Sequence, residues 1–119
     1  MQRNFRLTRS EDFKRVRRDG KSYAHPLVVL IALKGDDNNQ PRVRVGVAAG
    51  KSVGTAVYRN RAKRLLREVM RKLIPNIASG LDLILIARPM LASATLDDTQ
   101  RALLNLLQRA QVLLPKHES

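Results

Sequence analysis

Residues 55–74 constrain the fold more than any other part of this sequence, because their apolar residues recur at intervals of three and four. Such spacing places apolar side chains along one stripe of an α-helix, which must then pack against another element. The opposite side of the same helix carries cations, so the helix needs a core on one side and a polar environment on the other. The stripe consists of Tyr58, Ala62, Leu65, Leu66, Val69, Met70 and Leu73.

Three apolar segments predict strands that this helix can cover. Residues 27–33 (LVVLIAL) form a continuous run rich in β-branched side chains, which is typical of a buried strand. In residues 42–49 (RVRVGVAA) three valines alternate with Arg42, Arg44 and a glycine, so one face is apolar and the other polar. Residues 81–87 (LDLILIA) predict a third strand. We expect the first two segments to pair as antiparallel neighbours.

Two further helices are predicted near the ends of the chain. Thr8 and Glu11 have the spacing of a capping box, so a short helix is expected over about residues 9–19. Thr95 and Asp98 have the same relationship and are followed by leucines at helical spacing. This second signal predicts a long amphipathic helix near the C-terminus.

The predicted element order is α-β-β-(β)-α-β-α, where the bracketed strand is an additional one near residues 22–25. This order indicates an α+β fold, a single-domain two-layer sandwich. The helix over residues 55–74 and the C-terminal helix are expected on one sheet face, with the first helix near the other. A chain of 119 residues suffices for one core, so residues 1–119 are expected to form one domain with frayed termini at 1–5 and 115–119.

The charge of the chain indicates a polyanionic partner. Lys and Arg number 23 against 10 Asp and Glu, giving a net charge of +13. The cations are concentrated in two segments: residues 1–23 carry eight of them with three acids, and residues 51–72 carry eight with one acid. A positive excess of this size on a small surface is typical of proteins that bind nucleic acid.

Several classes of protein are disfavoured by what the sequence lacks. No run of 18 apolar residues predicts a membrane span, and the N-terminal segment lacks the apolar core of a secretory signal, so we expect a cytoplasmic protein. Cysteine is absent, which excludes disulfides and thiol chemistry. The ten acids and two histidines show no spacing typical of an acid–base pair or a metal site, so no catalytic residue or bound cofactor is predicted.

The polar side of the helix over residues 55–74 is the main candidate binding surface. At 100° per residue its cations fall together, and Glu68 is the one acid available to neutralise them. A solvated helix face usually alternates charge signs, and arginine suits phosphate better than lysine does. A merely solvated face remains the alternative. The cluster contains Arg59, Arg61, Lys63, Arg64, Arg67, Arg71 and Lys72 around Asn60.

The string RNRAKR, residues 59–64, resembles the RNR motif of bacterial ribonuclease P proteins. The flanking segments RVGVAAGKSVGTAVYRNR, RLTRSEDFKRVRRDGKS and LDLILIARP are similar to the strand-loop-helix passage, opening helix and last strand of that family. The likeness runs from about residue 6 to residue 108 in the same order. Four segments in order are far more specific than a basic motif alone.

This resemblance implies a fold and a function. The fold would be like domain 2 of ribosomal protein S5, with a rare left-handed β-α-β crossover. The chain would be the protein subunit of ribonuclease P, which removes the 5′ leader of precursor tRNA. Its partners would be the catalytic RNA and precursor tRNA, with magnesium required by the RNA, and the protein would be monomeric outside the particle.

The resemblance also implies two binding sites. The leader would bind in a cleft between the first helix and the exposed sheet face, where the family often has aromatic residues at the positions of Arg17 and Ile31. Phe13 is expected either in that cleft or as an anchor of the first helix, and Tyr58 is expected in the core. Contacts to the catalytic RNA are predicted for Lys51, Arg59, Asn60, Arg61, Lys63, Arg64 and Arg67, and contacts to the leader for Phe13, Lys14, Arg17 and Arg44.

Three other functions compete with this one. A structural RNA-binding protein of ribosomal type accounts equally well for size and charge, but not for the RNR motif. A DNA-binding regulator with the helix over residues 55–74 in the major groove requires a preceding helix, where the sequence predicts a strand. A stand-alone ribonuclease requires an acid–base pair that the sequence does not suggest.

Overall fold

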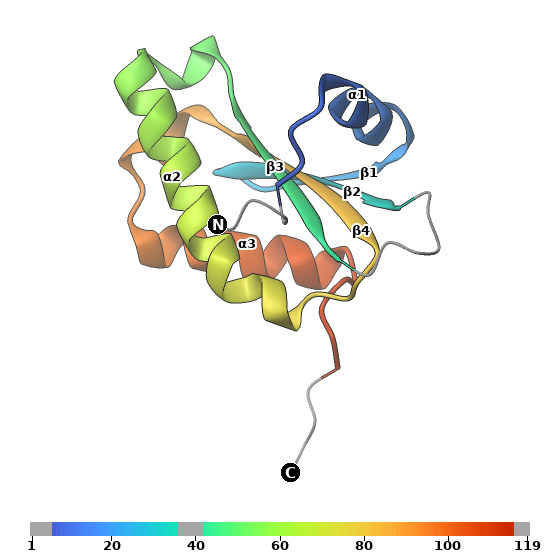
Figure 1. Ribbon diagram of the computed structural model, residues 1–119. Helices are drawn as coiled ribbons and strands as arrows, with labels where there is room; N and C mark the ends of the chain where they lie inside the picture. Colours follow the sequence, from blue (N-terminus) through green and yellow to red (C-terminus); the bar gives the residue numbers. More distant parts are fainter. Residues whose placement is uncertain (1–5, 36–41, 116–119) are drawn as a thin grey trace.

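A four-stranded mixed sheet with helices on both faces forms the protein (Figure 1). The computed structural model describes residues 6–35 and 42–115. The strands lie in the order β1-β2-β4-β3. No helix in these two ranges is long and apolar enough to cross a membrane. In chain order the elements are α1 (Ser10–Asp19), β1 (Lys21–Ala24), β2 (Val28–Lys34), β3 (Arg44–Ala49), η2 (Lys51–Val53), α2 (Ala56–Leu73), η3 (Ile74–Asn76), β4 (Leu81–Ala87), η4 (Pro89–Ser93) and α3 (Leu96–Arg109).

The predicted element order is confirmed, and the additional strand near residues 22–25 is present as β1. Helices α2 and α3 cover one face of the sheet and α1 covers the other, as predicted (Figure 1). The fold is thus a small α+β domain. The fraying predicted for residues 1–5 and 115–119 lies outside the described ranges, except for residue 115.

The predicted antiparallel pairing of β2 with β3 is wrong, because β4 lies between them. β4 pairs with β2 in antiparallel fashion and with β3 in parallel fashion. The physical reason is the composition of β4: Leu83 and Leu85 are buried on one face, and Asp82 and Ile84 on the other. A strand buried on both faces belongs in the middle of a sheet, where both of its edges are also paired. The connection from β3 through α2 to β4 is therefore a parallel crossover.

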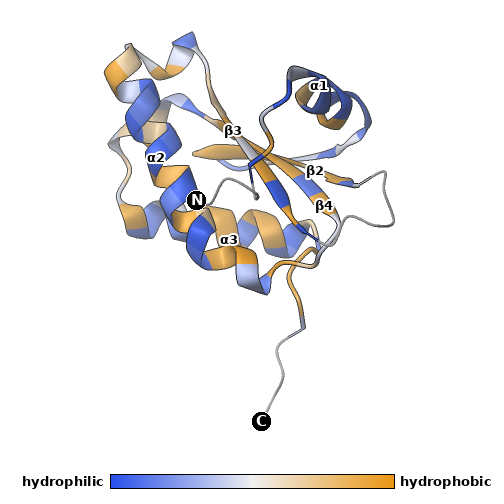
Figure 2. Ribbon diagram, in the orientation of Figure 1, coloured by the Kyte–Doolittle hydropathy of each residue, from blue (hydrophilic) through white to orange (hydrophobic). Residues whose placement is uncertain are grey.

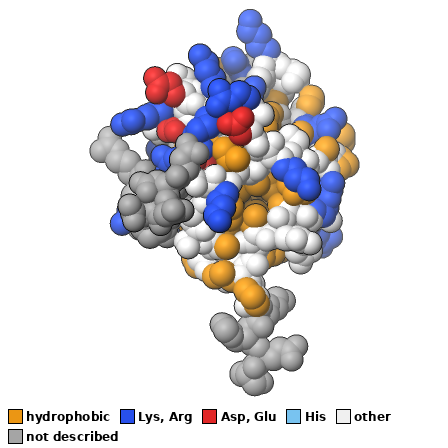
Figure 3. Space-filling model, turned by 90° about the vertical axis from the view of Figure 1, so that its right-hand side faces the viewer, with side chains coloured by type: hydrophobic (Ala, Val, Ile, Leu, Met, Phe, Trp, Pro, Cys, Tyr) orange, Lys and Arg blue, Asp and Glu red, His pale blue; other side chains and the backbone are white. Residues whose placement is uncertain are grey.

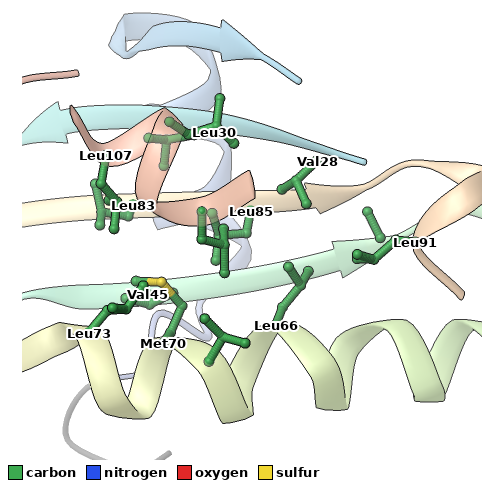
Figure 4. Packing of buried hydrophobic residues seen from close by; sticks show 14 of the residues in the cluster. Val28, Leu30, Val45, Leu66, Met70, Leu73, Leu83, Leu85, Leu91 and Leu107 are labelled. Atoms are coloured by element: carbon green, nitrogen blue, oxygen red, sulfur yellow. The ribbon is translucent and has the colours of Figure 1, made fainter. Parts of the chain in front are cut away.

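The main core lies between the sheet and the two long helices (Figure 4). The helix-facing residues of β2 pack nearest α3, and those of β3 and β4 pack nearest the apolar stripe of α2, which Figure 2 shows as orange positions on an otherwise blue helix. Val45 of β3 joins them, as its place in the alternating segment predicts. The buried side chains at the centre are Val28, Leu30, Leu66, Met70, Leu83, Leu85, Leu91 and Leu107.

A smaller core holds α1 on the other sheet face. Val16 of α1 packs with Leu7, Ile31 and Ile84, and all four are buried. The capping box predicted at the start of this helix is absent, because the helix begins one residue later and its N-cap, Arg9, makes no side-chain capping bond. The helix is therefore stabilised by the packing of Val16 and not by a capping hydrogen bond.

Helix α3 has the capping box that its sequence predicts. The Thr95 hydroxyl accepts a hydrogen bond from the Asp98 amide at 3.0 Å, and the Asp98 carboxylate accepts one from the Thr95 amide at 3.4 Å. Both bonds satisfy amide donors that have no partner within the helix. The start of α3 is thus fixed by local sequence.

Candidate nucleic-acid interface

Helix α2 presents its cations away from the core, so the candidate surface predicted from the sequence exists. Ala62 and Leu66 are fully buried under the helix, which fixes its rotation about its own axis. With that rotation Asn60 and Arg64 are exposed and Lys63 is half-buried. Lys51 is exposed in η2, the turn that precedes the helix.

Arg61 differs from its neighbours in the RNR motif because it is engaged within the protein. Its Nε donates a hydrogen bond to the Ala92 carbonyl at 2.6 Å, and its Nη2 donates one to the Ala94 carbonyl at 3.4 Å. Both carbonyls belong to η4 or the residue that follows it. The side chain therefore ties η4 to α2, which is a structural role in addition to the contact with RNA predicted for it.

Arg59 and Arg67 are half-buried. The Nε atom of each is buried and has no hydrogen-bond partner in the part of the chain that the structure describes. Burial, followed by repulsion from the charge on Arg6, lowers the pKa of the Arg67 guanidinium from its ordinary value. An anionic partner beside the guanidinium of Arg67 would offset its repulsion by Arg6.

A hollow of about 500 Å³ lies along the basic side of α2. Four arginines line it against a single acid, Glu68, whose pKa is lowered by a hydrogen bond from Arg71 at 2.7 Å. The acid is thus already paired, which leaves the hollow strongly electropositive. The residues lining it are Arg6, Arg61, Arg64, Leu65, Arg67, Glu68 and Leu96.

A second hollow, of about 220 Å³, lies between the segment before α1 and the sheet. Phe13 lines it, and the tip of the ring also lies directly over Gly46: a Cβ added at Gly46 would be 2.4 Å from the ring Cζ. Both roles considered for Phe13 are therefore compatible with its position, since it anchors α1 and also borders a cavity. The lining residues are Arg6, Leu7, Thr8, Phe13, Val45, Val47 and Arg67.

The four residues predicted to bind the leader do not all face this second hollow. Lys14 and Arg17 are exposed on α1. Arg44 is directed at acids: its Nε and Nη2 donate to the Asp82 carboxylate at 2.9 and 3.0 Å, and its Nη1 lies 3.7 Å from Asp12. Figure 3 shows the right-hand side of Figure 1, where basic side chains are spread over the surface and acidic ones occur in the upper part.

Sequence reasoning missed two features of the site. Arg6 lines both hollows, and only its place in a basic segment hinted at a role. Asp82 is fully buried and also receives the Arg15 guanidinium. The alternation in LDLILIA was a usable signal, because it places Asp82 on the face of β4 opposite its leucines, and an acid inside a sheet requires a cationic partner.

The prediction that Tyr58 lies in the core is wrong. Its surface is 54% exposed, although it has the helical spacing of the apolar stripe. The reason is its position in the first turn of α2, which begins beyond the end of the sheet (Figure 1). The stripe therefore continues past the core that buries the rest of it.

The described residues do not fit a site for magnesium. In residues 6–35 and 42–115 no three His, Cys, Asp or Glu side chains come together. The two acids near one another on the α1 face, Asp12 and Asp82, are both paired with arginine. Phosphate groups match this surface better than cations do.

Known proteins resemble this chain in sequence and in fold. The family model described as Ribonuclease P matches residues 1–111. The ribonuclease P protein component of Herpetosiphon aurantiacus is 44% identical over 112 residues, covering 94% of this chain and 89% of the relative. That of Brevibacillus brevis is 39% identical over 113 residues, covering 95% and 88%.

Two solved structures have the same fold. The RNase P protein of Staphylococcus aureus superposes with a TM-score of 0.80 at 29% identity, covering 92% of this chain and 97% of that one. The RNase P protein of Thermotoga maritima gives a TM-score of 0.76 at 30% identity, covering 87% and 96%. Since the family model spans nearly the whole chain, including the RNR motif on α2, this chain belongs to the ribonuclease P protein family.

Proposed function

We propose that this chain is the protein subunit of a ribonuclease P holoenzyme, the endoribonuclease that removes the 5′ leader of precursor tRNA. The observation that carries the proposal is the family match over residues 1–111, which includes the basic helix α2. In this assembly the RNA performs the hydrolysis with magnesium, and the protein contributes binding and charge neutralisation. The β3-α2-β4 crossover is left-handed in this proposal, as in domain 2 of ribosomal protein S5.

Helix α2 and the turn before it bind the catalytic RNA. The outward position of Lys51, Asn60 and Arg64 supports this, because exposed cations around an amide can bind phosphates and sugar hydroxyls together. Arg59 and Arg67 add two half-buried cations to the same surface. Arg61 contributes through η4, whose position it fixes. Lys63 adds a further cation on the same side of the helix.

The leader of precursor tRNA binds at the second hollow and along α1. Phe13 offers a ring there, and Arg67, which also lines the hollow, offers a cation. Lys14 and Arg17 extend the positive charge along the outside of α1. Arg44 acts indirectly, since it joins β3 to Asp82 of β4 and its Nη1 lies 3.7 Å from Asp12 of α1. A leader of any sequence could bind such a site, because rings and cations recognise features common to all nucleotides.

The test is cleavage of a precursor tRNA by a bacterial ribonuclease P RNA at low, near-physiological magnesium, with and without this protein. We expect the protein to restore cleavage at this magnesium concentration. The effect should be smaller when the leader of the substrate is cut to one nucleotide. A variant with Lys51, Lys63 and Arg64 replaced by alanine is the comparison for RNA binding. It should bind the RNA more weakly and restore less cleavage. A protein that binds the RNA yet leaves cleavage unchanged would instead be a structural RNA-binding protein.

A further inference from the structure

An exposed aromatic ring stands at the start of α2. Tyr58 is 54% exposed, and the preceding Val57 is 75% exposed. The chain has only four aromatic residues, and Tyr58 is one of them. The two other aromatic residues in the described ranges, Phe13 and Tyr23, both pack against a core. An amphipathic ring left in solvent beside a binding surface is a candidate contact residue.

The ring of Tyr58 is held in place by the backbone of the turn before the helix. A Cβ added at Gly54 would lie 3.2 Å from the Cδ2 and 3.3 Å from the Cβ of Tyr58, so the ring occupies the space that a side chain at Gly54 would need. Gly54 also has φ 130°, a conformation that residues with side chains rarely adopt. The turn thus supports the ring on one side and leaves much of it open.

The surroundings of the ring favour an anionic partner over an apolar one. Lys51 lies in the preceding turn, and Arg59 and Arg61 follow on the helix. The first turn of α2 contains no acid, whereas the first turns of α1 and α3 each contain two. A protein partner that buried Tyr58 would have to desolvate these cations, but a nucleic acid would pair with them.

We propose that Tyr58 stacks on an unpaired nucleobase of the RNA bound by α2. The inference rests on the proposed function, and it adds a contact that the RNR motif does not contain. Base stacking tolerates any base and carries no net charge. Tyr58 therefore contributes affinity that does not depend on salt, beside cations whose contribution does.

The experiment measures the affinity of the full-length protein for a bacterial ribonuclease P RNA over a series of salt concentrations. The variants are Tyr58→Phe, Tyr58→Leu and Tyr58→Ala. We expect Tyr58→Phe to bind within about twofold of the wild type, and the other two to bind roughly 5- to 100-fold more weakly, with the slope of affinity against salt unchanged. Equal unfolding midpoints for all variants would show that weaker RNA binding is not caused by loss of the folded structure.

Tyrosine fluorescence supplies a direct readout, because the chain has no tryptophan and its only tyrosines are Tyr23 and Tyr58. In a Tyr23→Phe protein the emission comes from Tyr58 alone, and stacking is expected to quench it when RNA saturates the protein. Wild-type protein that fails to bind the RNA would contradict the proposed function and this inference together. If the wild type binds the RNA but Tyr58→Leu binds it equally well, only the stacking interaction is overturned. The same holds if the emission of Tyr58 in the Tyr23→Phe protein is not quenched by the bound RNA.

Discussion

The carboxylate of Asp82 accepts two hydrogen bonds from the guanidinium of Arg44, at 2.9 and 3.0 Å, although Asp82 has no exposed surface. Arg15 of α1 donates to the same carboxylate. One buried acid therefore joins α1, β3 and β4. Because α1 and β3 border the hollow beside Phe13, this network also determines how far apart the two walls of the candidate leader site lie.

Replacing Asp82 with asparagine is expected to destabilise the fold by about 3 kcal/mol, since two guanidiniums then face a neutral partner in a partly buried site. Urea unfolding followed by circular dichroism measures the change. The control is Asp97→Asn, whose ion pair with Arg101 is 2.8 Å long but exposed and should contribute less than about 1 kcal/mol. Equal effects of the two substitutions would mean that the buried network does not hold α1.

Substitution of Gly46 tests the close packing of α1 on β3. An alanine Cβ there would lie 2.4 Å from the Phe13 ring, so Gly46→Ala must displace the ring or the helix, at a cost of about 1–3 kcal/mol. Gly50→Ala is the matched control, because nothing lies within 4 Å of its added Cβ. Thermal unfolding of both variants makes the comparison, and a neutral Gly46→Ala would show that α1 can move freely on the sheet.

Combining Gly46→Ala with Phe13→Ala extends the test. If the ring is what the new methyl group meets, the double substitution should destabilise the protein by less than the sum of the two single ones. Additive effects would place the strain elsewhere in β3. The coupling therefore reports whether Phe13 and Gly46 act as one unit.

The elements of this fold could be predicted from sequence because each has a strong local signal. Residues 81–87 have the composition of a strand and form β4 over the same bounds, and Thr95 with Asp98 fixed the start of α3. Pairing could not be predicted in the same way. Neighbouring strands were expected to pair, but burial of β4 on both faces decides the strand order, and that depends on the whole molecule.

The sequence predicted which kinds of residue lie on the binding surface better than it predicted what each of them does there. Helical spacing correctly placed cations such as Arg64 on the outer side of α2. It could not show that Arg61 binds the carbonyl of Ala92, because η4 is 31 residues away along the chain. It also failed for Tyr58, since periodicity gives the side of a helix on which a residue lies but not where the core ends.

Arg61 and Arg64 belong to the same motif, yet their replacement by alanine should have different effects. Arg61→Ala removes charged hydrogen bonds to buried backbone and should cost about 1–2 kcal/mol of stability in addition to RNA affinity. Arg64→Ala should change stability by less than about 0.5 kcal/mol, because the side chain is exposed. Urea unfolding and RNA binding of both variants separate the two roles. Equal stabilities would show that η4 does not depend on Arg61.

The salt dependence of RNA binding tests whether α2 binds phosphates. Lys51, Lys63 and Arg64 form no ion pair with the described part of the chain, so their charge is available to RNA. Replacing all three with alanine should weaken binding and flatten the plot of log affinity against log salt. For each phosphate that the variant no longer neutralises, the magnitude of the slope should fall by about 0.7–0.9. Arg101→Ala, on the outside of α3 and already paired with Asp97, is the control and should leave the slope unchanged. A triple variant with the wild-type slope would mean that α2 is only a solvated face, because cations that release no counterions on binding do not touch the nucleic acid.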